Sequence, residues 1–323
     1  MTTQRYFSLG RFAMRDALRY AGVKPGDCVM LPSFICRDVL AAVATLGATH
    51  DFYDVDKSLK PKNLTGVDTH KSIKAIVAVN YFGFAQDLDV FRDFERRTGA
   101  TIIEDNAHGL FSRDETNQLL GQREKFGITS FRKTLNVDNG AILTTSMREE
   151  EIEAQLAYDE SSISGRSKML RWLSKFESFT KIPVVNIAQF LSRLTRYISS
   201  GSQLPQRDAL AETIIPGLPN PNRQSVSVLQ NLNESVEIAR RRDLYLKLQP
   251  QAVAVGATLI FNELPINTCP YGLPIFANHN LKRKLAKIAR KNRVTLMTWP
   301  DLPDSILSCA PDFYSQVWLF NFK

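Results

Sequence analysis

Four polar side chains between residues 101 and 143 follow short apolar runs, and their types suit one cofactor. Asp105 and His108 come directly after one run, and Ser130 and Lys133 follow the next. Polar residues that follow parallel strands lie at the carboxyl edge of the sheet, where ligands bind. Pyridoxal phosphate needs a lysine for covalent attachment, a carboxylate beside its ring nitrogen and donors for its phosphate. The four residues therefore predict a site for this cofactor.

The surrounding pattern alternates strands with helices, which favours a doubly wound, mostly parallel sheet. One expected strand, residues 75–79, is a continuous apolar run, as in parallel strands buried on both faces. The expected strands cover residues 28–31, 52–55, 75–79, 101–104 and 142–145. Helical spacing predicts helices over residues 8–22, 38–46, 88–97 and 147–158. We expect one large α/β domain over residues 1–215.

The second half of the chain predicts a small α+β domain over residues 216–323. Its expected elements are a long helix over residues 226–248, stopped by Pro250, then short apolar runs around a basic helix at residues 280–292. Residues 199–222 have a linker composition, rich in Pro, Gly, Ser and Gln.

A basic segment at residues 161–200 has apolar residues at helical spacing on both sides of Pro183. Such a pair of helices could lie on a membrane surface or a partner. The other interpretation is a helical hairpin on the protein's own surface. Glu177 and Pro183 interrupt the apolar face, which favours the hairpin.

Composition narrows the classes of function. The chain has 323 residues, 44% of them apolar and 23% charged, as in globular proteins. The net charge of +8 is compatible with nucleic acid, an anionic membrane or phosphorylated substrates, but no nucleic-acid motif is present. We see neither a transmembrane run nor a signal pattern, so we expect a cytoplasmic protein. Cys28, Cys36, Cys269 and Cys309 form no CxxC pair, which predicts free thiols and no metal site.

Each candidate residue also has a simpler interpretation. Lys133 could be a surface lysine in a basic loop, and Asp105 could cap the turn that follows it. Arg132 could hold a substrate phosphate or carboxylate, or form an ion pair within its loop. Ser8 and Gly10 open the first helix, where free N–H groups could bind a phosphate or simply begin the helix.

Five segments in order resemble the DegT-type sugar aminotransferases, which are pyridoxal-phosphate enzymes of fold type I. They are KPGDCVMLPSF, LGATHDFYDVD, AIVAVNYFGFAQDLD, IIEDNAHG and SFRKTLNVDNGAIL. The last resembles the family's lysine loop, in the shorter form where the lysine follows Ser-x-Arg. Beyond residue 150 the resemblance is thinner, although NRQSVSVLQNLN and RRRDLYLKL stand where the family has comparable segments.

The resemblance assigns roles to the four polar residues. It implies that Lys133 binds the cofactor covalently and moves the proton during catalysis. Asp105 would pair with the ring nitrogen, and His108 would lie beside the ring's 3′-oxygen. Ser130 would bind the phosphate.

The resemblance also implies further cofactor contacts. The backbone at Gly10, Arg11 and Phe12 matches the family's other phosphate contacts. Asn222 would reach the phosphate of a partner subunit, and Asn220 is nearly as good a match.

Some positions depart from the family's pattern. Cys36 stands where the family stacks an aromatic residue on the cofactor ring, so Phe34 or Tyr81 would have to substitute. Asn106 replaces a usual alanine, and Gly140 alone remains of two glycines after the lysine loop. The chain ends at VWLFNFK, where most members continue.

The implied activity is transfer of an amino group from glutamate to a keto sugar, linked to a nucleotide, in polysaccharide or secondary-metabolite biosynthesis. A homodimer with shared active sites is implied as well. Two alternatives stay open. One is elimination or dehydration on the same cofactor, although the family's dehydratases replace the lysine that is Lys133 here. The other is a binding or regulatory protein without catalysis, which Cys36 and Asn106 would allow.

Overall fold

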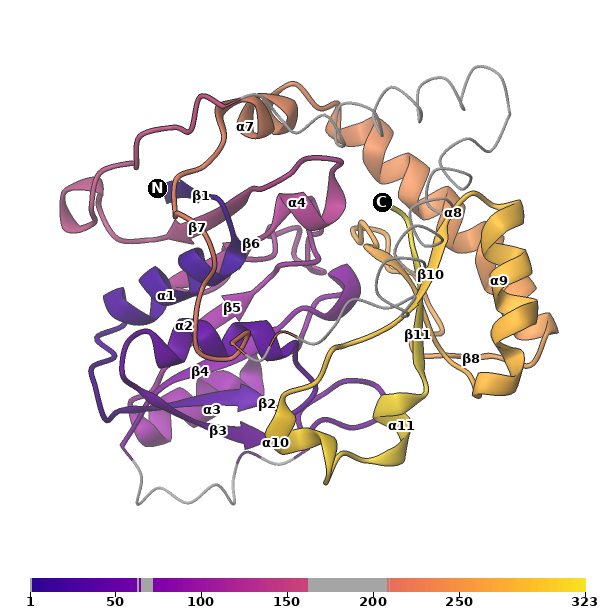
Figure 1. The fold of residues 1–323 in the computed structure, drawn as a ribbon, viewed down its shortest axis with the longest axis horizontal. Coiled ribbons are helices and arrows are strands. Elements are labelled where there is room, and N and C mark those ends of the chain that lie inside the picture. Colours follow the sequence, from indigo (N-terminus) through magenta and orange to yellow (C-terminus); the bar gives the residue numbers. More distant parts are fainter. Residues whose placement is uncertain (1, 63, 65–71, 162–207, 209) are drawn as a thin grey trace.

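The computed structural model describes residues 2–62, 64, 72–161, 208 and 210–323. These residues form two sheets with helices packed around them (Figure 1). The larger sheet comprises β1 (Thr3–Phe7), β2 (Cys28–Pro32), β3 (Thr49–Tyr53), β4 (Ile73–Val79), β5 (Thr101–Asp105), β6 (Phe126–Thr129) and β7 (Ala141–Thr145). Its associated helices are α1 (Gly10–Tyr20), α2 (Leu40–Ala44), α3 (Asp89–Thr98) and the single turn α4 (Phe131–Thr134).

The strand order is β1-β7-β6-β5-β4-β2-β3. In this order, every pair of neighbours between β6 and β3 is parallel. Strand β7 runs antiparallel to both β6 and β1. In this register Val79 lies opposite Asp105, and Asp105 lies opposite Ile128. Because these strands end at the same level, the residues that follow them share one edge of the sheet.

The smaller sheet is antiparallel, with the order β10-β11-β9-β8. Its strands are β8 (Thr258–Leu259), β9 (Gly272–Phe276), β10 (Thr295–Thr298) and β11 (Val317–Asn321). The helices of this part are α7 (Arg223–Gln230), α8 (Glu234–Ala254), α9 (Lys282–Lys291), α10 (Asp304–Leu307) and α11 (Asp312–Ser315). Figure 1 shows α8 and α9 side by side beyond this sheet, and one apolar core continues from sheet to sheet.

Most predicted elements of the first half are confirmed, but the helix expected over residues 147–158 is wrong. Only a 3-10 turn at Glu149–Glu151 forms there, and Ile152 is already extended. Gln155 explains the difference, because its side chain accepts from the Tyr6 amide at 2.7 Å and donates to the Tyr6 carbonyl at 3.1 Å. The segment is therefore attached to the edge strand β1, which a helix would prevent.

The single helix expected over residues 226–248 is also wrong, because two helices occupy this region. The Asn233 side chain accepts from the Val236 amide and starts α8 as an N-cap. Pro250 does not end α8, which continues to Ala254. The basic helix expected at residues 280–292 is confirmed as α9 with a 3-10 turn before it.

The boundary at residue 215 stays a prediction. The chain still contacts the larger sheet just beyond it, since the Ser8 amide donates to the Pro219 carbonyl at 3.0 Å. The basic segment at residues 161–200 lies almost wholly outside the described residues, as does the first part of the expected linker.

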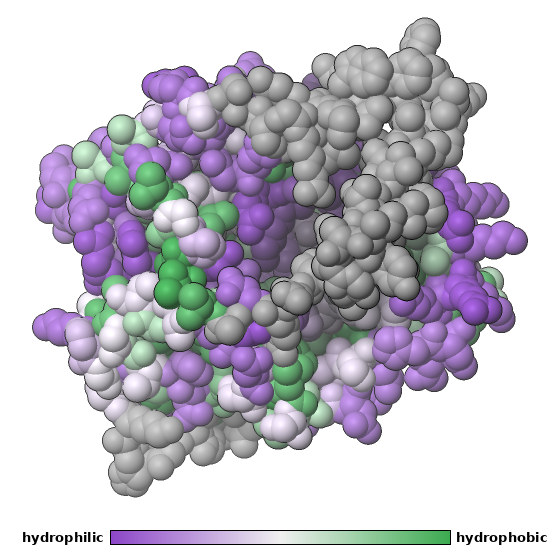
Figure 2. Space-filling view, viewed as in Figure 1, coloured by the Kyte–Doolittle hydropathy of each residue, from purple (hydrophilic) through white to green (hydrophobic). Residues whose placement is uncertain are grey.

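No helix within the described ranges combines the length and the apolar character needed to cross a bilayer. Figure 2 shows a mostly hydrophilic face with a hydrophobic strip over the segment that crosses α1 and α2 in Figure 1. Leu210, Ile214 and Leu218 are the large exposed apolar residues of this segment.

Candidate active site

Lys133 lies in the turn α4, directly after β6. Its Nζ is 3.3 Å from Nε2 of His108, which belongs to the loop after β5. The turn is fixed by Gly140, whose carbonyl accepts from the Arg132 amide and whose amide donates to the Ser8 carbonyl. A Cβ on Gly140 would overlap the ring of Phe131. The glycine of the Asp-Asn-Gly sequence thus allows the lysine loop to pack against the start of α1.

Asp105 is the buried acid at the end of β5, only 6% exposed. Its Oδ1 accepts from the Ala107 amide at 2.9 Å. Burial raises the pKa of Asp105, while the charge of Lys133 and the Ala107 amide oppose that rise. The charge of Lys133 therefore reaches Asp105, and the role of this pair towards the cofactor stays a prediction.

The thiol of Cys36 is influenced by the same two charged residues. Burial raises the pKa of this thiol, the charge of Lys133 lowers it, and Asp38 and Asp105 raise it further. The thiol thus lies within electrostatic range of both Lys133 and Asp105.

The other two candidates for contact with the cofactor ring are parts of the core. Phe34 is fully buried, with its ring centroid 5.1 Å from that of Trp299 and 4.7 Å from that of Tyr314. The Tyr81 hydroxyl donates to the Phe34 carbonyl at 2.9 Å. Whether either residue substitutes for the missing aromatic stays a prediction.

His108 is enclosed between two aromatic rings. Its centroid lies 4.6 Å from that of Tyr271 and 5.7 Å from that of Phe82, with both rings nearly parallel to it. Burial, with a contribution from the charge of Lys133, lowers the pKa of His108 well below its usual value, so the ring is neutral. An ammonium at Lys133 can only donate to Nε2, which puts the ring proton on Nδ1. That nitrogen is buried, and no described residue forms a hydrogen bond with it.

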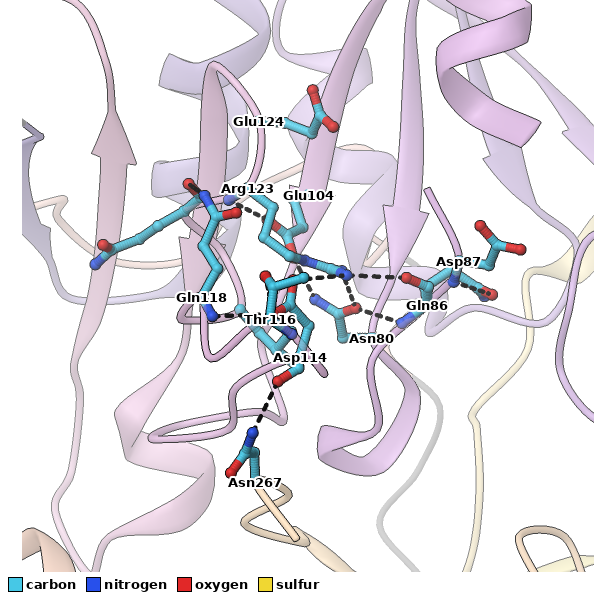
Figure 3. A network of polar contacts seen from close by, with 12 residues as sticks. Asn80, Gln86, Asp87, Glu104, Asp114, Thr116, Gln118, Arg123, Glu124 and Asn267 are labelled. Atoms are coloured by element: carbon cyan, nitrogen blue, oxygen red, sulfur yellow. Dashed lines mark hydrogen bonds and ion pairs between the residues drawn. The ribbon is translucent and has the colours of Figure 1, made fainter. Parts of the chain in front are cut away.

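Glu104 has a separate, structural role, because successive residues of a strand face opposite sides of the sheet. Its carboxylate accepts from the Arg123 guanidinium and from Nδ2 of Asn80, each at 2.8 Å (Figure 3). Arg123 also donates to Oδ1 of Asn80 at 2.9 Å. This network neutralises the second carboxylate of the strand and joins β5 to Asn80 and Arg123.

Gly10 and Ser130 meet at the start of α1. A Cβ on Gly10 would lie 3.7 Å from Cβ of Ser130 and 3.8 Å from its Oγ. The Phe12 amide donates to the Leu9 carbonyl at 3.1 Å, so the amides of Gly10 and Arg11 precede the helical ladder. Ser130 is 2% exposed, and its hydroxyl caps no amide of α4. These groups could donate hydrogen bonds to an anion. The amides of Gly10 and Arg11 are better placed for this than the Phe12 amide, which already donates to Leu9.

Asn222 and Asn220 are used inside the chain. The Asn222 side chain caps α7 by accepting from the Ser225 amide at 3.0 Å, and it donates to the Ser161 carbonyl at 2.7 Å. The Asn220 side chain donates to the Ala157 carbonyl at 2.8 Å. The role of Asn222 towards a partner subunit stays a prediction.

Three residues at the site were not predicted from the sequence. Tyr271 stacks on His108. Arg241, only 1% exposed, donates to the Thr134 carbonyl at 2.9 Å. Lys323 donates to the Arg132 carbonyl at 2.6 Å. The two cations hold the backbone on either side of Lys133, although each lies more than 100 residues away from it in the sequence.

The residues present fit pyridoxal phosphate. The buried carboxylate has a raised pKa, which a cationic ring nitrogen would lower. Two buried nitrogens, Nδ1 of His108 and Nε of Arg132, have no hydrogen-bond partner among the residues that the structure describes. When bound, this cofactor supplies an electron sink for the substrate's electrons.

The DegT/DnrJ/EryC1/StrS aminotransferase family matches residues 7–306 of the chain. The chain belongs to this family. Its enzymes are pyridoxal-phosphate-dependent aminotransferases, so the predicted family, fold class, enzyme class and cofactor are confirmed. The roles given above to single residues remain predictions.

Two relatives and one solved structure illustrate the likeness. MosB of Rhizobium meliloti is 31% identical over 145 residues, which are 43% of this chain but 28% of MosB. A pleiotropic regulatory protein of Geobacillus stearothermophilus is 22% identical over 309 residues, or 91% of this chain and 79% of that protein. Helicobacter pylori PseC, an aminotransferase involved in the biosynthesis of pseudoaminic acid, has a TM-score of 0.62 at 12% identity. That comparison covers 98% of this chain and 81% of PseC.

Proposed function

We propose that this aminotransferase moves an amino group from glutamate to a keto sugar that is linked to a nucleotide. The observation that carries the proposal is Lys133, whose Nζ lies 3.3 Å from a neutral, buried His108 and interacts with the buried Asp105. The family supports a sugar substrate, and the net charge of +8 suits a diphosphate group.

Each residue of the site has a separate role in this proposed reaction. Lys133 would hold the cofactor covalently and would carry the proton between the substrate and the cofactor. Asp105 would keep the ring nitrogen in its charged form. His108 stays neutral and orients the lysine through Nε2, while its rigid stacking on Tyr271 prevents the ring from turning.

The test is covalent trapping of the cofactor. We expect the purified protein to absorb visible light with pyridoxal phosphate bound, and glutamate to bleach this absorbance. Borohydride should fix the cofactor to Lys133, as read by peptide mass, and Lys133→Ala should abolish the label. The exposed Lys24→Ala is the matched control and should keep it. Labelling elsewhere, or no response to glutamate, would contradict the proposal.

We further propose a cytoplasmic homodimer. The exposed strip of Leu210, Ile214 and Leu218 supports a protein partner on this face. The strip adjoins the site, because the Ser8 hydroxyl donates to the Leu218 carbonyl at 2.5 Å. All four cysteines are free thiols, as a reducing compartment allows. Light scattering should show a dimer that Leu218→Glu weakens, whereas a monomeric native protein would disprove it.

A second candidate is a regulatory protein that binds the cofactor or a sugar without turnover. The alignment with a pleiotropic regulatory protein over 91% of the chain favours it. A bound chromophore that glutamate leaves unchanged would support this candidate over transamination.

A further inference from the structure

Arg132 precedes Lys133, and no hydrogen bond or ion pair of its guanidinium group is found in the described part of the chain. Its Nε is buried and makes no hydrogen bond. Among the described residues no ion pair of Arg132 is found, because the neighbouring carboxylate of Asp38 pairs with Arg11 at 3.3 Å. Arg132 is half-buried, and a cation that is partly withdrawn from water without a directly paired anion is costly to a fold, so its presence calls for an explanation.

The surroundings of Arg132 add positive charge. Burial lowers the pKa of its guanidinium, and the charge of Arg11 lowers it further. On the other side, the Nζ of Lys323 lies on the Arg132 carbonyl. Burial lowers the pKa of Lys323 to about 8, and the charge of Arg132 contributes to this shift. Arg132 thus feels the positive charge of Arg11 and acts on that of Lys323, while Asp38 and Asp138 supply opposing negative charge.

The neighbouring groups are donors suited to an anion with several oxygens. The Gly140 amide and carbonyl tie the Ser8 and Arg132 backbones together, which brings Arg132 to the start of α1. There the buried Ser130 hydroxyl lies against Gly10, where the first amides of the helix are free. A guanidinium, a hydroxyl and helix amides together match a phosphate better than a carboxylate, which has only two oxygens.

We propose that Arg132 binds a phosphate group, with Arg11 and Lys323 supplying positive charge around it. The inference rests on the proposed function at Lys133. The phosphate belongs to the cofactor or to the diphosphate of the substrate. The two sources share the same chemistry and are separated by experiment.

The first experiment titrates the protein without cofactor with pyridoxal phosphate and, in parallel, with pyridoxal, which lacks the phosphate. Arg132→Met should weaken the binding of pyridoxal phosphate by about 10–100-fold and leave pyridoxal unchanged, if the cofactor's phosphate is the ligand. Arg132→Lys should restore part of the affinity. The exposed Arg148→Met is the matched control and should behave as the native protein.

The second experiment titrates the protein loaded with cofactor with pyrophosphate and uridine diphosphate in a calorimeter. A loss of this binding in Arg132→Met, with normal affinity for pyridoxal phosphate, assigns the phosphate to the substrate. Unchanged binding of both ligand classes would overturn the proposal, and so would an equal loss for pyridoxal. Borohydride labelling of Lys133 in the same samples shows independently whether the proposed function holds.

A third experiment needs no variant, in case Arg132→Met does not fold. Phenylglyoxal modifies accessible arginines of the native protein, and peptide mass reports the extent at Arg132. Pyridoxal phosphate or pyrophosphate should protect this residue at least about tenfold, because a bound phosphate would occupy its guanidinium. Pyridoxal should not protect it. Modification at the same rate with and without both phosphate ligands would overturn the proposal.

Discussion

Nη2 of Arg241 donates to the carbonyl of Thr134, the residue after Lys133, at a distance of 2.9 Å. The same guanidinium donates to the Tyr271 carbonyl at 3.0 Å and to Glu237 at 2.6 Å. Helix α8 is therefore connected through one buried side chain to the lysine turn and to the residue that stacks on His108.

Arg241→Met should destabilise the protein by about 3–5 kcal/mol, because it leaves Glu237 and three backbone carbonyls without their buried donor. Urea unfolding measures this change. Arg242→Met is the control, since this partly exposed neighbour also donates to backbone carbonyls. It should cost less than about 1 kcal/mol. Equal losses of unfolding free energy in the two variants would show that the buried contacts of Arg241 stabilise the fold no more than those of Arg242.

The buried histidine predicts a pH dependence of stability. The folded pKa of His108 lies well below the ordinary value of 6.5, so between these values the unfolded chain binds a proton that the folded chain does not. Stability should therefore fall as the pH drops below 6.5, by up to about 1.4 kcal/mol per pH unit from this residue. Thermal melts of His108→Gln should show a shallower decline. His279→Gln, at an exposed site, should keep the native slope because His108 is still present.

Asp105→Asn should weaken the binding of pyridoxal phosphate by about 10–100-fold, because the ring nitrogen loses a charged partner. Absorbance titration of the protein without cofactor measures the affinity. Asp89→Asn is a matched control on an acid whose side chain is 84% exposed. An unchanged affinity in Asp105→Asn would remove this residue from the site.

Gly140→Ala should both destabilise the protein and impair cofactor attachment. The added Cβ would overlap the Phe131 ring, and φ is +140° at this position. We expect a loss of about 2–4 kcal/mol from overpacking and backbone strain together. Gly99→Ala isolates the backbone contribution, because φ is +74° there and nothing lies within 4 Å. Its cost should be about 1 kcal/mol, measured by the same urea unfolding.

The sequence predicted the elements that place the site, because local signals define them. The apolar runs that became β4 and β5 are buried on both faces, and the polar residues that follow them share one edge of the sheet. Asp105 and Lys133 follow directly from that rule, since the position of a strand end needs only the chain on either side of it.

The features that the sequence did not predict depend on contacts between residues far apart in the chain. Gln155 bonds the backbone of Tyr6, which cancels the helical preference of its own segment. Arg241 and Lys323 contact the turn around Lys133 from more than 100 residues away, and nothing in their own segments indicates this contact. A basic residue in a helix usually faces solvent, so the buried position of Arg241 has no local indication.

Because Glu104 and Arg123 are enclosed, added salt should weaken the exposed ion pairs of this molecule and leave this pair intact. Their side chains are 0% and 6% exposed, so dissolved counterions cannot reach them. The Arg11–Asp38 pair is open to solvent, since the Asp38 side chain is 44% exposed. At 1 M salt, electrostatic interactions are screened within about 3 Å in water. A concentrated salt wash should therefore strip loosely held anions from the outer cations while the strand that carries Asp105 keeps its internal support.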